Sequence, residues 1–157
     1  MLKLFCVLFA FVGIGGSVKA ECCNSICESF DDAVKIATYT NSVYCEYGVD
    51  DSEFEKIMDA LKNVTRGSRD MPAYGVSLDG EVRVALKSGV WVELTMNGEK
   101  TFGEMPFEKL LIQVEPEAMG FNLVRYHNGE YEGRCFYLDL DVSMRELYDT
   151  ISSISEN

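Results

Sequence analysis

The residues that could carry out chemistry are a single histidine, a group of cysteines and an excess of carboxylates. His127 is the only histidine, and it precedes an Asn-Gly pair that is typical of a β-turn. A Cys–His nucleophile pair would need a reduced cysteine and a third group that orients the imidazole. Cys135 follows His127 by eight residues, but in an oxidising compartment we expect it to be disulfide-bonded. His127 is therefore interpreted as a solvated turn histidine, and we expect no catalytic residue here.

Metal ligands are suggested at three places, and none of them completes a known pattern. The spacing of Cys23 and Cys27 fits the first half of a structural zinc site, but the second pair is missing. The acidic residues at 50–53, and the pair Asp139 and Asp141, do not follow a calcium-binding EF-hand loop. We therefore expect neither a metal nor a cofactor. A small hydrolase that uses two of the 26 carboxylates stays an alternative without assigned residues.

The stretch 74–104 carries the candidate binding surface, because it alternates apolar and polar residues around three Gly-containing turns. Pairing the strands about Asp79-Gly80, Ser88-Gly89 and Asn97-Gly98 predicts an antiparallel meander with one aliphatic face. The other face would combine aromatic and charged side chains, a mixture common in binding hot spots. The candidate binding residues are Trp91, Phe102, Arg83 and Glu93. A helix that covers this face would instead make Trp91 and Phe102 part of a two-sided core.

Helical patterns flank the predicted meander. Residues 29–48 show apolar residues at roughly helical spacing, weakened by the Thr, Asn and Ser of TYTNS. Residues 52–64 have a capping box, Ser52 with Glu55, and a clear apolar stripe. Residues 106–114 start with a proline and read as a short helix, although LLIQV fits a strand equally well.

Two more elements complete the domain. A second hairpin is predicted over 121–140 around Asn128-Gly129, with Tyr126 opposite Tyr131. A C-terminal helix begins at a second capping box, Ser143 with Glu146, and its apolar stripe should dock on the sheet. The predicted fold class is α+β: an antiparallel β-meander plus a second hairpin, two N-terminal helices, a short connecting helix and a C-terminal helix packed on the sheet.

The first twenty residues have the pattern of a signal peptide. Lys3 precedes an apolar run, LFCVLFAFVGI, and Val18-Lys19-Ala20 places small residues at the expected cleavage positions. An uncleaved anchor is the alternative, but the apolar run is shorter than the ~20 residues that span a membrane. We expect cleavage after Ala20, a single domain over 21–157, and a secreted or periplasmic location with no membrane attachment afterwards.

An exported chain with several cysteines is expected to form disulfides. Five of the six cysteines lie outside the signal peptide: Cys22, Cys23, Cys27, Cys45 and Cys135. We expect Cys135 to bond to Cys22, Cys23 or Cys27, which would tie the N-terminus to the sheet. An odd number leaves at least one thiol free, or available for a disulfide-linked dimer or larger assembly.

The charge balance limits the partners. Without Lys3 and Lys19, 12 basic residues face 26 acidic ones, a net charge of −14. Such a chain repels phosphates, so we expect no binding to nucleic acid, and any protein or small-molecule partner that charge attracts would be basic. The predicted function is a non-enzymatic binding, interaction or inhibitory module.

Overall fold

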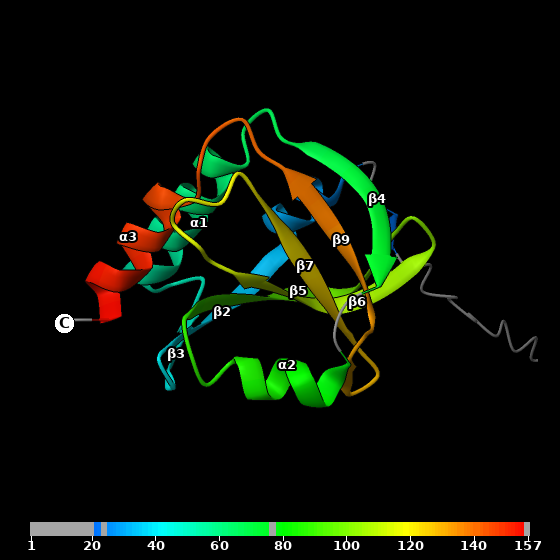
Figure 1. The fold of residues 1–157 in the computed structure, drawn as a ribbon, viewed down its shortest axis with the longest axis horizontal. Coiled ribbons are helices and arrows are strands. Elements are labelled where there is room, and N and C mark those ends of the chain that lie inside the picture. Colours follow the sequence, from blue (N-terminus) through cyan, green and yellow to red (C-terminus); the bar gives the residue numbers. More distant parts are fainter. Residues whose placement is uncertain (1–20, 23–24, 76–77, 156–157) are drawn as a thin grey trace, which may run out of the picture.

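The computed structural model describes residues 21–22, 25–75 and 78–155 and has a mixed α+β fold (Figure 1). The predicted signal peptide, 1–20, lies outside the described residues. The helices are η1 (Ile26–Asp32, a 3-10 helix), α1 (Ser52–Val64), α2 (Asp79–Ala85) and α3 (Arg145–Ser155). The strands are β1 (Glu21–Cys22), β2 (Ala33–Thr40), β3 (Val43–Gly48), β4 (Arg69–Gly75), β5 (Val90–Phe102), β6 (Met105–Gln113), β7 (Gly120–His127), β8 (Glu130–Tyr131) and β9 (Arg134–Asp139).

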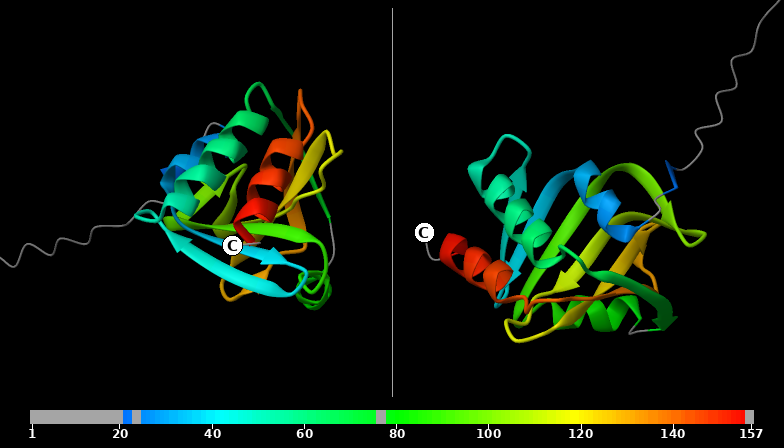
Figure 2. Two further views of the ribbon diagram at one scale, coloured as in Figure 1. Left: turned by 90° about the vertical axis from the view of Figure 1, so that its left-hand side faces the viewer. Right: turned by 90° about the horizontal axis from the view of Figure 1, so that it is seen from above.

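The strands form one bent sheet in the order β3-β2-β5-β6-β7-β9-β4, in which neighbouring strands are antiparallel. The short strand β1 adds to β5 in parallel, and β8 pairs with β7. Two helices, α1 and α3, lie together on one side of the sheet, and α2 lies on the opposite side (Figures 1 and 2). None of the helices in the described ranges is long and apolar enough to cross a membrane.

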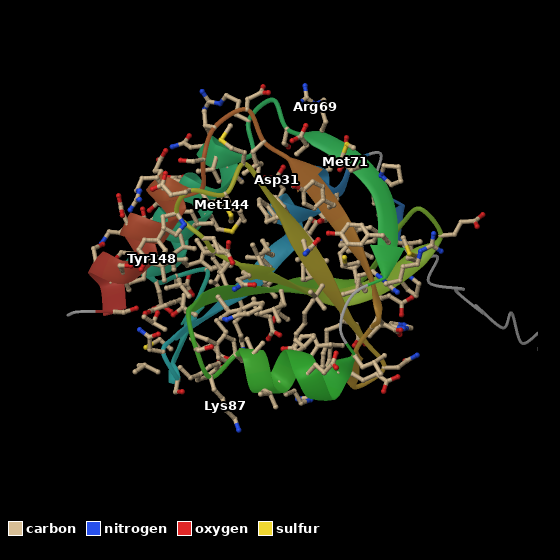
Figure 3. All side chains as sticks on the ribbon, in the orientation of Figure 1. Asp31, Arg69, Met71, Lys87, Met144 and Tyr148 are labelled. Atoms are coloured by element: carbon tan, nitrogen blue, oxygen red, sulfur yellow. The ribbon has the colours of Figure 1, made fainter. Side chains whose placement is uncertain are left out.

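The main core lies between the sheet and the pair α1 and α3. Alternate residues of the central strands point into it and are almost completely buried, for example Ile36, Leu94 and Ile112. Each fully buried aliphatic side chain of this kind stabilises the fold by about 1.5–3 kcal/mol. Met144, just before α3, is fully buried in this core, and Tyr148 packs against its edge (Figure 3).

The two helices with the clearest apolar stripes are confirmed. Helix α1 spans the predicted residues, but its N-cap is Asp51, whose side chain makes no capping hydrogen bond, so the predicted Ser52–Glu55 capping box does not form. Helix α3 buries Leu147 and Ile151, as its pattern indicated. The Glu146 carboxylate accepts a hydrogen bond from the Asn63 amide at 2.8 Å, which joins the ends of α3 and α1.

The predicted helix over 29–48 is wrong: most of this segment is the hairpin of β2 and β3. Asn41 and Ser42 form its turn with positive φ angles of 48° and 74°. Valine, isoleucine, threonine and tyrosine dominate these strands, and such side chains favour a pleated strand over a helix. In the sequence, the Asn41-Ser42 pair was the local indication of a hairpin turn at this position.

The predicted meander is also wrong in its connections. Residues 79–85 form helix α2, and β5 continues as one strand through Asn97-Gly98, where a turn was expected. The pairing of β5 with β6 steps from Thr95–Lys109 to Lys100–Phe107. Asn97 and Gly98 therefore lie in an irregular, bulged part of β5. The chain reverses later, at Gly103 and Glu104, whose φ angles are 53° and 63°.

The predicted short helix over 106–114 is a strand, β6. Its neighbours β5 and β7 pair with it on both edges. Leu110 and Ile112 enter the main core, whereas Leu111 lies in a second apolar cluster on the opposite face. A strand that is buried on both faces reads as a continuous apolar run, which explains the ambiguity of LLIQV.

The hairpin around Asn128-Gly129 is confirmed, with Tyr126 opposite Tyr131 in the pairing of β7 and β8. The turn residues have φ angles of 51° and 91°, the left-handed conformation that a tight two-residue turn requires. This hairpin end lies next to α2, because the Tyr131 backbone N–H donates to the Asp79 carboxylate at 2.8 Å.

No disulfide forms among the three described thiols, Cys27, Cys45 and Cys135. The expected bond between Cys27 and Cys135 is therefore wrong: Cys27 contacts the Ser68 hydroxyl at 3.4 Å, and the Cys135 thiol donates to Asn122 at 3.7 Å. The side chains of Cys22 and Cys23 lie outside the described residues, so the pairings predicted for them stay predictions. Cys45 is half-buried on the edge strand β3.

Candidate binding groove between helix α2 and the sheet

The sheet separates two apolar clusters, and strand β5 contributes side chains to both. Its even-numbered residues, such as Val92 and Leu94, face the main core, while Trp91 and Glu93 face helix α2. Alternation along a strand sends neighbouring side chains to opposite faces. The smaller cluster consists of the buried residues Val82, Trp91, Leu111, Val124 and Tyr131, with Tyr39, Ala85, Leu86 and Tyr126 at its edges.

Trp91 lies beneath α2 and is only 7% exposed. Its indole N–H donates to the carbonyl of Ser88 at 2.8 Å, which fixes the ring under the loop that follows α2. The sequence left open whether a helix covers the Trp91 face of the sheet. In the structure helix α2 packs over it. Trp91 is covered by α2 and is not part of a flat exposed patch.

Phe102 is not brought together with Trp91. Its ring packs against Phe136 in the main core, with centroids 5.2 Å apart. The predicted register placed both aromatics on one face because it assumed a turn at Asn97-Gly98. In the structure β5 continues through Asn97-Gly98, and Trp91 lies in the cluster under α2 while Phe102 packs against the main core on the other side of the sheet.

Glu93 is a buried carboxylate, 4% exposed, on the Trp91 side of the sheet. The Tyr131 hydroxyl donates to one of its oxygens at 2.5 Å, and the Lys109 ammonium lies 3.0 Å from the other. A buried carboxylate needs such partners, because burial without them costs several kcal/mol. Two groups from β6 and β8 thus hold Glu93 in place.

This buried carboxylate changes the ionisation of nearby phenols. Burial, and secondarily the negative charge of Glu93, raises the pKa of Tyr39 to about 12. The same two causes raise the pKa of Tyr131 well above its usual range, and the hydrogen bond to Glu93 adds to the effect. Both phenols are therefore neutral at physiological pH and can act as hydrogen-bond donors.

Arg83, the remaining candidate residue, lies on the exposed side of α2. Its guanidinium is 2.7 Å from the Asp79 carboxylate and 5.3 Å from the centre of the Tyr131 ring. The hydrogen bond from Arg83, followed by the backbone N–H of Tyr131, lowers the pKa of Asp79. Asp79 therefore links α2 to β8, and Arg83 supports that link rather than facing the groove.

A groove of about 420 Å³ lies beside these residues, between α2 and the sheet. We call it the α2 groove. Its apolar lining comes from Val82 and Ala85 of α2 and from Trp91, Phe121 and Val124 of the sheet. Its polar lining comes from Glu81, Gln113, Glu115, Asn122 and Tyr137.

Sequence reasoning found only Trp91 among these lining residues. The groove depends on α2, which the sequence presented as part of a strand. The available sign was local: Asp79 and Glu81 stand in the first turn, and Asp79 and Arg83 have the i, i+4 spacing of a helical ion pair. Gln113, Glu115 and Asn122 come together only because β6 and β7 are neighbours in the sheet.

The groups first considered for chemistry do not converge. His127 lies between two carboxylates, with Nε2 2.9 Å from Glu99 and Nδ1 3.8 Å from Glu132. Asp139 is paired with Arg69 at 2.5 Å. Within the described ranges, no three His, Cys, Asp or Glu side chains are grouped so that they could hold a metal ion.

No protein-family model matches this chain, and neither a curated protein nor a solved structure is significantly similar to it.

Proposed function

We propose that this protein is an exported, non-enzymatic binding protein that holds a small ligand with an aromatic or branched apolar body in the α2 groove. The observation that carries the proposal is the groove itself: a concave site with an apolar floor of Val82, Trp91 and Val124. Ligand sites typically have such floors, with a few polar groups placed at the edge.

The dimensions of the groove support a small molecule rather than a macromolecule. A volume of about 420 Å³ lies near the lower end of the range of about 300–1,000 Å³ that is common for small-molecule sites. The buried Glu93 with its partners Tyr131 and Lys109 stiffens the sheet next to Trp91. A site on a rigid sheet loses little entropy when it binds a ligand.

The proposed location outside the cytoplasm depends on the pattern of the first twenty residues, which has a basic start, an apolar run and a small-residue cleavage site. The strongly acidic composition suits a protein that must stay soluble in an extracytoplasmic fluid. Together these features support a secreted or periplasmic carrier or scavenger of a small compound.

Trp91 provides the test, because it is the only tryptophan and it lines the groove. The purified protein is titrated with 2-phenylethanol, 2-phenylethylamine and 3-phenylpropionate while its fluorescence is recorded. We expect saturable changes with at least one of these compounds. Absence of a saturable change with all three, at concentrations up to the millimolar range, would overturn the proposal.

A pair of α2 variants locates the binding. Ala85→Phe fills the groove, whereas Val84→Phe adds the same ring to a residue of α2 that is 64% exposed and does not line the groove. We expect Ala85→Phe to abolish the saturable signal and Val84→Phe to retain it, with both melting temperatures close to that of the wild type. Equal binding by the two variants would place the ligand elsewhere and contradict the proposal.

A further inference from the structure

We infer that the α2 groove selects an organic cation: a compound with a primary or quaternary amine next to an aromatic or branched aliphatic group. This inference rests on the proposed function, because it assigns the charge of the ligand that the groove would hold. Its starting point is the charge of the lining. Two carboxylates, Glu81 from α2 and Glu115 from the segment after β6, line the groove, and the described lining contains no lysine, arginine or histidine.

The basic side chains near the groove are engaged elsewhere. Arg83 donates to Asp79 and to the Gly129 carbonyl, over the ring of Tyr131. Lys109 is bound to the buried Glu93. Lys87, just beyond α2, points away from the body of the protein (Figure 3). Within the described ranges, neither Glu81 nor Glu115 forms an ion pair with these or other side chains.

One hydrogen bond restrains the exposed Glu81 carboxylate. One of its oxygens accepts a hydrogen bond from the backbone N–H of Leu78 at 3.2 Å, at the start of α2. This contact holds the side chain at the edge of the groove and lowers the entropy lost when a ligand cation pairs with it. The exposed Glu115 supplies a second negative charge from the sheet side.

The aromatic lining favours the same ligand charge. Trp91 and Tyr137 border the groove, whereas the Phe121 side chain packs in the main core and contributes little to the groove surface. Aromatic faces attract ammonium groups by about 0.5–2 kcal/mol, and tryptophan is the best of them. The neutral polar groups, the amides of Gln113 and Asn122, offer carbonyl oxygens that can accept hydrogen bonds from an amine.

The electrostatic field of the whole protein also favours a cationic ligand. Without residues 1–20 the net charge is −14, which repels anionic ligands and raises the local concentration of cations at the surface. An apolar floor, aromatic walls and an acidic edge together describe a site for a molecule whose apolar part is buried and whose ammonium group remains at the rim.

A matched set of ligands tests the inference. 2-Phenylethylamine, 2-phenylethanol and 3-phenylpropionate share a ring and a two-carbon linker and differ in charge. We expect the amine to bind on the order of 10-fold more tightly than the alcohol, with the carboxylate weakest, because two rim ion pairs act together. Dissociation constants come from Trp91 fluorescence and are confirmed by calorimetry.

Variants of the two carboxylates assign the selectivity to the groove. Glu81→Gln and Glu115→Gln should each weaken amine binding by about 2- to 5-fold and leave binding of the alcohol unchanged. Glu130→Gln removes one negative charge from the exposed turn end of β8, away from the groove lining, and serves as the matched control. Melting temperatures of all three variants show whether each is folded.

The outcomes are distinguishable. If the alcohol binds as tightly as the amine, the inference about charge is overturned and the proposed binding function stands. If the amine preference survives in the Glu81→Gln, Glu115→Gln double variant, the overall charge rather than the groove selects the ligand, which also overturns the inference. If none of the three compounds binds, the proposed function itself fails.

Discussion

The Tyr131 hydroxyl donates a hydrogen bond of 2.5 Å to the Glu93 carboxylate in the layer between helix α2 and the sheet. Both residues are at most 5% exposed, so the bond is made in a region that water scarcely reaches. Lys109 supplies the compensating charge at 3.0 Å. The smaller cluster is therefore organised around a polar centre, whereas the main core is aliphatic and aromatic.

Tyr131→Phe should destabilise the protein by about 1–3 kcal/mol, because Glu93 would lose a donor while staying buried. Urea unfolding followed by circular dichroism measures the change. Tyr44→Phe is the matched control, since it removes a similar bond to Glu46 at 2.6 Å on an exposed strand. We expect the control to change the free energy of unfolding by less than about 0.5 kcal/mol. Equal effects of the two substitutions would contradict this account.

The stability of the protein should fall in alkaline solution. The pKa of Tyr39 is raised to about 12 by burial and by Glu93, whereas an unfolded tyrosine titrates near pH 10. The folded state thus holds this proton more tightly. The resulting stabilisation is complete below about pH 10 and is lost as the pH rises toward about 12.

Urea midpoints between about pH 8 and pH 11 should show this loss, and Tyr39→Phe should make it less steep. Part of the dependence should remain, because the pKa of Tyr131 is raised too. An unchanged slope in Tyr39→Phe would mean that this phenol does not contribute.

Gly120 should not accept a side chain. A Cβ at this position would lie 2.7 Å from the carbonyl oxygen of Leu138 and would also meet the hydroxyl of Tyr137. Gly120→Ala should therefore cost about 1–3 kcal/mol. Gly80→Ala is the control, because an added Cβ on α2 has open space within 4 Å and should stabilise the helix by up to about 1 kcal/mol. Thermal unfolding of both variants tests the opposite signs.

Cys135 should be unreactive in the native state. It is fully buried, and burial raises the pKa of its thiol to about 11. Iodoacetamide at pH 8 followed by peptide mass spectrometry should leave Cys135 unmodified, whereas addition of urea should expose it to alkylation. Recovery of Cys135 in a disulfide-linked peptide would instead support the bond expected from the exported character of the chain.

The sequence predicted those elements whose local signals agree with their tertiary surroundings. Helices α1 and α3 have clear apolar stripes, and the Asn128-Gly129 turn has a conformation that few other residue pairs adopt. The mixed α+β class followed from these elements. The candidate site was predicted in part: Trp91 and Glu93 share a face, and Phe102 lies on the other.

The errors arose where contacts distant in sequence decide the structure. Val82, Val84 and Leu86 alternate like a strand, but β5 takes β2 as its neighbour, and residues 79–85 are left to cover Trp91 as a helix. The segment 33–48 illustrates the converse, because its β-branched residues become strands once β5 provides an edge for pairing. Neither choice is visible in a window of a few residues.

Trp91 has one more consequence as the sole tryptophan of a protein whose two apolar clusters lie on opposite faces of the sheet. Its emission senses the α2 side of β5, while the helical circular dichroism comes largely from α1 and α3 on the other side. The two optical signals therefore follow different halves of the molecule. Whether they disappear at the same denaturant concentration measures the cooperativity between the halves, and hence whether the α2 layer opens independently of the main core.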